Sequence, residues 1–203
     1  MTIKQKVALG RPATIAAPRE TILACAAKLF AEKGFEGASL QDVAKAVGIS
    51  KAAVYHYFPT KQVIYDEIVI DLLSRLRLHV CNGIDDTADY GERLRQLMTS
   101  HAEFFEANYT EFVTLLHGFG GLSRDIGEGL VSVRDAYEIM VRELMTSAKR
   151  DGALDIGDPA IATRAVLSML NWMARWYKPG GRLSAREFAE EYFTLIYNGL
   201  RPR

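Results

Sequence analysis

Residues 39–61 read SLQDVAKAVGISKAAVYHYFPTK, and this stretch decides the fold of the chain. Ser39 can cap a short helix through its hydroxyl, and Asp42 favours the same helix end electrostatically. Gly48 ends this helix, and Ser50 can cap a second one. Two short helices joined by a tight glycine-containing turn form a helix-turn-helix. The second helix of such a unit lies in the major groove of DNA.

The second helix has a surface that suits this role. Val54 and Phe58 point inward, and Pro59 closes the helix because the residue before a proline disfavours the helical region. The positions left on the outside are small, basic or polar-aromatic: Ser50, Lys51, Ala52, Ala53, Tyr55, His56 and Tyr57. Small residues allow an approach to base edges, and the longer side chains can reach phosphates. Taken alone, the helix could equally be an ordinary surface helix with several tyrosines.

Charge is distributed unevenly along the chain. The 203 residues carry no formal net charge, yet residues 1–61 have an excess of five positive charges and the remainder an excess of five negative ones. The positive field therefore coincides with the helix-turn-helix, where counterion release from DNA requires it.

Composition favours an all-α protein of the cytoplasm. Hydrophobic residues make up 49% of the chain, and no alternating strand pattern recurs. No apolar run reaches the length of a membrane span, and the N-terminus lacks the pattern of a signal peptide. Cys25 and Cys81 form no CxxC motif, so we predict two small buried residues in a reducing compartment.

The chain divides into three parts. Residues 1–17 form a basic arm that is either a disordered tail or a contact to the DNA minor groove. Residues 18–61 form the DNA-binding domain, in which a supporting helix over 18–34 precedes the helix-turn-helix. Residues 62–203 form a larger helical domain for ligand binding and dimerisation. The further helices are predicted at 61–79, 89–108, 110–117, 123–150, 158–177 and 184–199.

Two features of the larger part concern assembly and signalling. The helix over 158–177 is apolar on more than one side and the last helix is rich in aromatic residues, so packing against a second copy would bury both in a homodimer. Burial inside a monomer is the alternative, but two-fold DNA half-sites favour the dimer. The helix that starts at Lys61 is expected to be the only direct connection between a ligand pocket and the DNA-binding domain.

The segment ILACAAKLFAEKGFEGASLQDVAKAVGISKAAVYHYFPTKQVIYDEIV, residues 22–69, resembles the TetR family of transcriptional regulators. The resemblance implies nine helices, with a three-helix DNA-binding domain on a larger ligand-binding and dimerisation domain. It also implies a palindromic double-stranded operator and, more often than activation, repression that a small molecule relieves.

The resemblance also implies roles for individual positions. Phosphate contacts are implied for Ser39 and Lys61. Positions facing base edges at the start of the recognition helix are implied for Lys51, Ala52 and Ala53. Contacts to phosphate, sugar or base are implied for Tyr55, His56 and Tyr57. A lysine in the first turn of a helix opposes the helix dipole, so a nearby DNA phosphate is the expected compensation for Lys61.

Residues 171–200 resemble the C-terminal end of family members that respond to acyl-CoA thioesters. Such an effector needs an apolar tunnel and a cationic or aromatic rim. The candidates for the tunnel are Phe104, Phe105, Leu115, Tyr137, Met140, Met169, Trp172 and Met173. The candidates for the rim are Arg134, Arg175, Trp176 and Arg182. The alternatives are core or dimer packing for these residues, a drug-like or aromatic effector, or no ligand.

Motifs of catalysis are missing from the sequence. None of the four histidines belongs to an HExxH motif or lies beside paired carboxylates, the residues GFGGLS at 118–123 fail the GxGxxG pattern, and GLSRD lacks the GxSxG elbow. We therefore expect no enzyme activity, no metal and no cofactor.

Overall fold

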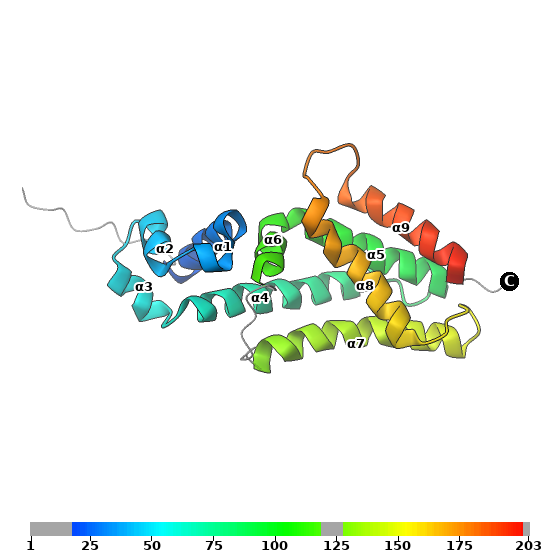
Figure 1. Ribbon diagram of the computed structural model, residues 1–203. Coiled ribbons are helices and arrows are strands. Elements are labelled where there is room, and N and C mark those ends of the chain that lie inside the picture. The colour runs from blue at the N-terminus through cyan, green and yellow to red at the C-terminus, as the bar shows by residue number, and fades with distance from the viewer. Residues whose placement is uncertain (1–17, 119–127, 201–203) are drawn as a thin grey trace, which may run out of the picture.

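The computed structural model describes residues 18–118 and 128–200, and these residues form nine helices and no strand (Figure 1). The helices are α1 Pro18–Gly37, α2 Leu40–Val47, α3 Lys51–Tyr57, α4 Lys61–Asn82, α5 Tyr90–Ala107, α6 Tyr109–Gly118, α7 Glu128–Arg150, α8 Pro159–Trp176 and α9 Ala185–Leu200. The predicted all-α fold is confirmed. None of these helices combines the length and apolar character that a membrane span requires.

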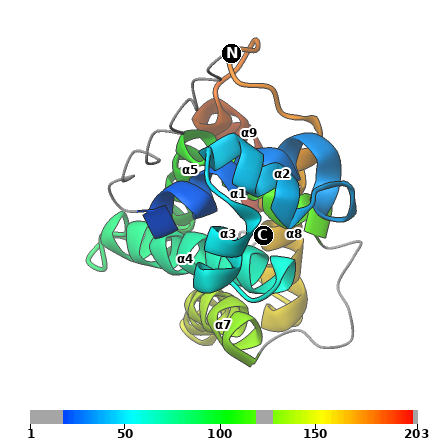
Figure 2. The ribbon, with the colours of Figure 1, turned by 90° about the vertical axis from the view of Figure 1, so that its left-hand side faces the viewer.

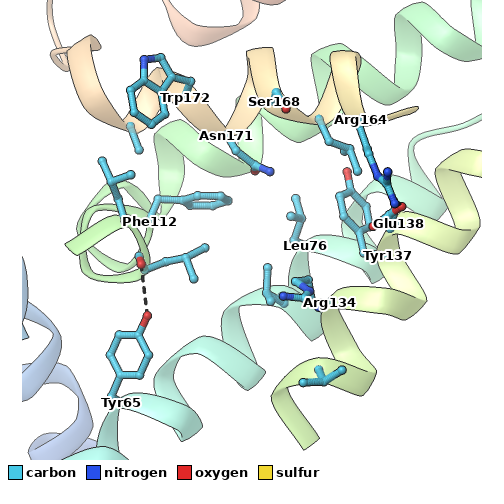
Figure 3. A pocket seen from close by; sticks show the side chains of 16 residues that line it. Tyr65, Leu76, Phe112, Arg134, Tyr137, Glu138, Arg164, Ser168, Asn171 and Trp172 are labelled. Atoms are coloured by element: carbon cyan, nitrogen blue, oxygen red, sulfur yellow. Dashed lines mark hydrogen bonds and ion pairs between the residues drawn. The ribbon is translucent and has the colours of Figure 1, made fainter. Parts of the chain in front are cut away.

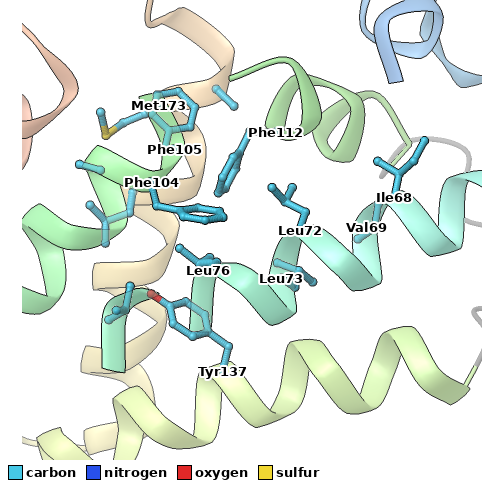
Figure 4. Close-up of a cluster of buried hydrophobic side chains, with 14 of the residues drawn as sticks. Ile68, Val69, Leu72, Leu73, Leu76, Phe104, Phe105, Phe112, Tyr137 and Met173 are labelled. Atoms are coloured by element: carbon cyan, nitrogen blue, oxygen red, sulfur yellow. The ribbon is translucent and has the colours of Figure 1, made fainter. Parts of the chain in front are cut away.

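Helices α1 to α3 gather at one end of the long helix α4 (Figure 1). Helices α5, α6 and α7 pack against the remaining length of α4, α8 packs on α5, α6 and α7, and α9 packs on α5. The core of the larger part is a cluster of aliphatic and aromatic side chains from α4, α5, α6, α7 and α8 (Figure 4). Its labelled members include Leu72, Leu76, Phe105, Phe112 and Met173. Helix α4 contributes to both ends, and α1 also packs directly on α6. The expectation that α4 is the only direct connection between the ligand pocket and the DNA-binding domain is therefore wrong.

The helix-turn-helix is held by the predicted caps. The hydroxyl of Ser39 accepts a hydrogen bond from the backbone of Asp42 at 3.1 Å, and the Asp42 carboxylate accepts one from the backbone of Ser39 at 3.0 Å. The Ser39 hydroxyl also donates to the Asp42 carboxylate at 2.6 Å, and this hydrogen bond, together with the one from the Ser39 backbone, lowers the pKa of Asp42. Gly48 has a φ of 79°, and Ser50 accepts from the backbone of Ala53 at 3.1 Å. Each helix of the motif therefore begins with its first-turn N–H groups partly satisfied.

The supporting helix α1 bends at Gly34, whose φ of 74° and ψ of 161° lie outside the helical region. The predicted end of this helix coincides with the bend, and the chain then adds one more helical turn. Within that turn the ring of Phe35 is buried, 5.5 Å from the ring of Phe30 and 5.2 Å from that of Tyr65. The bend therefore places Phe35 against α4.

Helix starts in the larger part also follow local chemistry. Asp158 caps α8 by accepting from the backbone of Ala160 at 2.7 Å. Ser184 and Glu187 form the predicted capping box of α9, with backbone-to-side-chain distances of 2.7 and 3.2 Å. Helix α7 corresponds to the helix predicted over 123–150, and the predicted start of that helix lies outside the described residues.

Packing between α5 and α9 depends on a glycine. A Cβ atom added to Gly91 would lie 2.7 Å from the ring of Tyr197, so the two helices approach more closely than a larger residue allows. Arg95 of α5 donates to Glu190 of α9 at 2.6 Å in the same interface.

The prediction that both cysteines are buried is wrong. Cys81 is exposed and Cys25 only half-buried. Helix α4 continues to Asn82, beyond the predicted end at residue 79, and this last turn directs Val80 inward and Cys81 outward, where its Sγ atom lies 3.0 Å from Sδ of Met140.

We predict that Gly34→Ala destabilises the protein by about 1–3 kcal/mol, because the backbone conformation at Gly34 is almost restricted to glycine. Urea unfolding measures this change. Gly37→Ala is the matched control, since Gly37 has no positive φ and its added Cβ would make only an ordinary 3.5 Å contact. Equal stabilities of the two variants would contradict the assignment of strain to Gly34.

Candidate functional site

The outer surface of α3 is polar and accessible. Lys51 and Ala52 are exposed at the start of the helix, and Tyr55, His56 and Tyr57 are exposed further along. Figure 2 looks onto this end of the molecule, with α2 and α3 toward the viewer. The surface therefore offers a cation, aromatic rings and hydroxyl groups to a partner.

The inner side of α3 and its C-cap residue Phe58 face the core. Val54 and Phe58 are fully buried, and Ala53 is half-buried. The Nζ atom of Lys51 lies 5.6 Å from the centre of the Tyr55 ring, which is a cation–π distance. The inward direction predicted for Val54 and Phe58 is confirmed.

Lys61 is anchored to the protein itself. Its ammonium group donates to the carbonyl oxygens of Phe35 at 2.6 Å and Ala38 at 3.1 Å, and it lies 4.3 Å from the centre of the Phe35 ring. Glu36 lies 3.9 Å away. These groups are a physical compensation for a cation at the start of α4. The phosphate contacts of Lys61 and Ser39 stay predictions.

A cavity of about 470 Å³ lies among α4, α6, α7 and α8 (Figure 3). Its apolar lining comprises Tyr65, Leu73, Leu76, Phe112, Leu115, Leu116, Val131, Tyr137, Leu167, Trp172 and Ala174. Its polar lining comprises Arg134, Glu138, Arg164, Ser168 and Asn171. The volume lies within the range of small-molecule sites, and a mostly apolar wall with a few polar groups is typical of them.

Charged groups border the cavity on α7 and α8. Glu138 forms an ion pair with Arg142 and a longer one, 3.6 Å, with Arg164. Arg134 pairs with Asp135 at 3.1 Å. The side chain of Arg164 is 69% exposed, and that of Arg134 about half exposed. Since exposed ion pairs are weak, both guanidinium groups can turn toward an anion at the edge of the cavity.

A buried polar pair lies behind the cavity wall. The Nδ1 atom of His101 is 2.8 Å from the hydroxyl of Tyr137, whose ring lines the cavity. Complete burial lowers the pKa of His101 to about 3, so the imidazole is neutral, and burial raises the pKa of Tyr137. Among the described residues, Nε2 of His101 has no hydrogen-bond partner.

The structure brings four of the residues predicted for the ligand site to the cavity: Leu115, Arg134, Tyr137 and Trp172. The others do not line it. Phe104, Phe105 and Met173 are buried in the core, and Met140 lies at a second hollow beside Cys81. On α8, Met169 is half-buried and Arg175 and Trp176 are exposed, as is Arg182 in the following loop.

Helix α8 explains this division. Arg164, Leu167, Ser168 and Asn171 follow the i, i+3, i+4, i+7 spacing of one helix face, and that face borders the cavity. Met169, Met173 and Trp176 follow the same spacing on another face. A prediction by residue type favours aromatic residues and methionines, so it misses the cavity-facing set with its polar members. The spacing itself is the signal that could have found them.

The acidic, histidine and cysteine side chains offer no site for a metal ion in the part of the chain that the structure describes. Within residues 18–118 and 128–200, no three of them are grouped suitably.

Comparisons with known proteins agree with this architecture. Residues 22–68 match the family model of bacterial regulatory proteins of the tetR family, and residues 87–200 match that of the tetracyclin repressor-like C-terminal domain. The chain is 29% identical over 190 residues to the HTH-type transcriptional repressor KstR2 of Rhodococcus jostii (strain RHA1), and the match covers 90% of each chain.

Two solved structures are similar along almost their whole length. The TetR family transcriptional regulator PfmR from Thermus thermophilus has a TM-score of 0.79 and 44% identity, covering 87% of this chain and 97% of that one. AibR, in a complex with isovaleryl coenzyme A and operator DNA, has a TM-score of 0.78 and 26% identity, covering 89% of this chain and 98% of that one.

A helix-turn-helix at one end of α4 and a largely apolar cavity along its middle define a ligand-responsive, DNA-binding transcriptional regulator. The chain belongs to the TetR family. The family and these relatives are transcriptional regulators, so the chain is not an enzyme.

We predict that His101 makes stability fall in acid. Between pH 6.5 and about 3, the unfolded chain binds a proton at His101 that the folded chain does not, so the free energy of unfolding falls as the pH falls through this window. From pH 7 to pH 5 the loss from this residue is on the order of 2 kcal/mol. Urea unfolding at both pH values measures it.

His101→Gln should remove this part of the pH dependence. His79→Gln is the control for loss of a histidine, since His79 is exposed near the end of α4. A His101→Gln variant with the pH profile of the unmodified protein would refute the assignment.

Proposed function

We propose that this chain is a homodimeric repressor that binds a palindromic operator and is released by a small hydrophobic effector, an acyl-CoA thioester. One observation carries the proposal: the mostly apolar cavity has two partly exposed guanidinium groups at its edge. The relatives support it, because KstR2 is named a repressor and AibR is described with isovaleryl coenzyme A and operator DNA.

The DNA-binding domain comprises residues 18–61 in this proposal, and residues 62–203 form the ligand-binding and dimerisation domain. The basic arm over 1–17 lies outside the described residues. The residues proposed to contact DNA are Ser39, Ser50, Lys51, Ala52, Ala53, Tyr55, His56, Tyr57 and Lys61. All of these residues except Ala53 and Lys61 are exposed in the described structure, which supports the assignment.

In this proposal the acyl group of the effector lies inside the cavity, and its nucleotide lies at the edge. An acyl group gains free energy by leaving water for the apolar wall, at roughly 25 cal/mol per Å² of buried apolar surface. The charged nucleotide end stays at the edge, because burial of unpaired charge is costly. Arg134 and Arg164 meet its phosphates there by charge-assisted hydrogen bonds, and Trp172 offers a ring for stacking.

The dimer forms through α8 and α9. These helices expose large apolar side chains: Ile161, Trp176 and Leu195, of which Ile161 and Leu195 are 66% and 69% exposed. A second copy would remove this surface from water. A single short recognition helix reads only a few base pairs. A two-fold dimer that binds two half-sites one helical turn of DNA apart holds its two recognition helices about 34–36 Å from each other.

We predict that Lys51→Ala and Tyr55→Ala each weaken operator binding by about tenfold, roughly 1–2 kcal/mol, without changing thermal unfolding. Lys51→Ala should also reduce the slope of log affinity against log salt concentration by about one. A mobility-shift titration at several salt concentrations measures both. Lys178→Ala, in the exposed loop after α8, is the matched control for loss of a lysine. Unchanged affinity of both α3 variants would rule out the recognition-helix assignment.

We predict that at least one member of a panel of acyl-CoA thioesters releases the protein from its operator. Arg164→Ala should raise the concentration needed for half-release by up to about fivefold, since Arg164 is largely exposed and an exposed ion pair contributes at most about 1 kcal/mol. Arg175→Ala, on the same helix but away from the cavity, should leave it unchanged. Release by aromatic or drug-like compounds alone, or by none, would show that the effector is not a thioester.

A further inference from the structure

The guanidinium group of Arg19 lies where three helices of the DNA-binding end meet (Figure 2). Its Nη2 atom donates to both carboxylate oxygens of Glu67 in α4, at 2.6 and 2.5 Å. Its Cζ atom lies 5.2 Å from the centre of the ring of Phe58, the C-cap residue of α3. A residue in the first turn of α1 therefore contacts both the end of α3 and α4.

Helix α3 has little other support at this end. Among the described helices, α3 packs extensively only on α2. Phe58 is fully buried, and its backbone N–H donates to the carbonyl oxygen of Val54 at 2.9 Å. The exposed side chains of Tyr55, His56 and Tyr57 lie directly before Phe58 in the chain. Their placement therefore depends on how the ring of Phe58 is held.

The chemistry of arginine suits this position. A planar guanidinium group can contact an aromatic ring while its N–H groups bind a carboxylate. The side chains of Arg19 and Glu67 are 48% and 31% exposed, and an ion pair with this much exposure contributes little to the stability of a fold. We therefore expect the contact to affect the placement of the end of α3 more than the free energy of unfolding.

A cation at this end of the molecule could instead contact a DNA phosphate directly. The two roles predict opposite effects of the Glu67 carboxylate. If Arg19 binds a phosphate, Glu67 competes with the DNA for it, so loss of the carboxylate charge strengthens DNA binding. If Arg19 holds the end of α3, loss of that charge weakens operator binding, although the protein becomes more positive.

Readout of bases and contact with phosphates differ in the precision that they require. Hydrogen bonds to base edges depend on the placement of each side chain, whereas phosphate contacts depend mainly on charge and carry no sequence information directly. A displaced α3 would lose more affinity for the operator than for unrelated DNA. The ratio of the two affinities therefore measures the placement of the helix.

We propose that Arg19 is a positioning residue for sequence recognition: bound to Glu67, it holds Phe58 and with it the C-terminal half of α3. This role rests on the proposed function, in which α3 reads the operator. It does not involve the effector, so the ligand-free protein is sufficient for the test.

The experiment measures affinity for an operator that the unmodified protein selects from a random DNA library, and for a scrambled duplex of the same composition. Glu67→Gln removes the charge that binds Arg19 and keeps the size of the side chain. Asp66→Asn, one residue earlier in α4, is the matched control, because Asp66 accepts a hydrogen bond from Gln62 rather than from Arg19. Arg19→Gln and the double variant Arg19→Gln, Glu67→Gln complete a double-mutant cycle.

We expect Glu67→Gln to weaken operator binding by about threefold to fivefold, as for loss of a cation–π contact and a partly exposed ion pair. It should not weaken binding to the scrambled duplex, and Asp66→Asn should weaken neither. The double variant should bind the operator no more weakly than Arg19→Gln alone, since both changes remove the same contact. Thermal unfolding shows that each variant is folded.

Stronger operator binding by Glu67→Gln would overturn the positioning role and indicate a phosphate contact for Arg19. An unchanged ratio of operator to scrambled affinity in Glu67→Gln would also overturn it. Lys51→Ala in the same titration tests the proposed function separately. Weaker binding by Lys51→Ala together with an unchanged ratio in Glu67→Gln would count against the positioning role alone, whereas unchanged binding by Lys51→Ala would count against readout by α3.

Discussion

The ammonium group of Lys61 joins the two parts of this molecule. It stands at the first residue of α4, where a cation is unfavourable, and is stabilised by the carbonyl oxygens of Phe35 and Ala38 and by the ring of Phe35. A second cation, Arg19, ties the start of α1 to Glu67 of α4 at 2.5 Å. Together these contacts fix the start of α4 against the DNA-binding unit, so the position of the recognition helix depends on α4.

The cavity lies against the same helix one to four turns further on. Tyr65, Leu73 and Leu76 of α4 form part of its wall, and α6 completes the side nearest to α1. Because α6 packs on α1, a displacement of α6 by a ligand would be transmitted to α1, since close-packed interiors transmit strain. Behind the wall, on α5, the buried and uncharged His101 lies with its Nδ1 atom 2.8 Å from the hydroxyl of Tyr137.

Local chemistry makes much of the fold predictable. The helices after Ser39, Ser50 and Ser184 start where a serine hydroxyl caps the first turn. Helix α1 bends at Gly34 because glycine readily adopts the non-helical conformation found there. The cavity is less predictable, because the size of a side chain does not reveal which helix face it occupies. The partners of Lys61 could not be predicted, since they are backbone carbonyls brought close only by the bend in α1.

Both tryptophans of the chain, Trp172 and Trp176, belong to α8, and the first of them lines the cavity. Trp172 is 59% exposed and Trp176 packs edge-on against Phe188, so the two indoles differ in their contact with water. The tryptophan fluorescence of the protein therefore originates from a single helix, α8, which borders the cavity and carries part of the exposed apolar surface. Without any attached dye, the chain carries its own optical reporter of that helix.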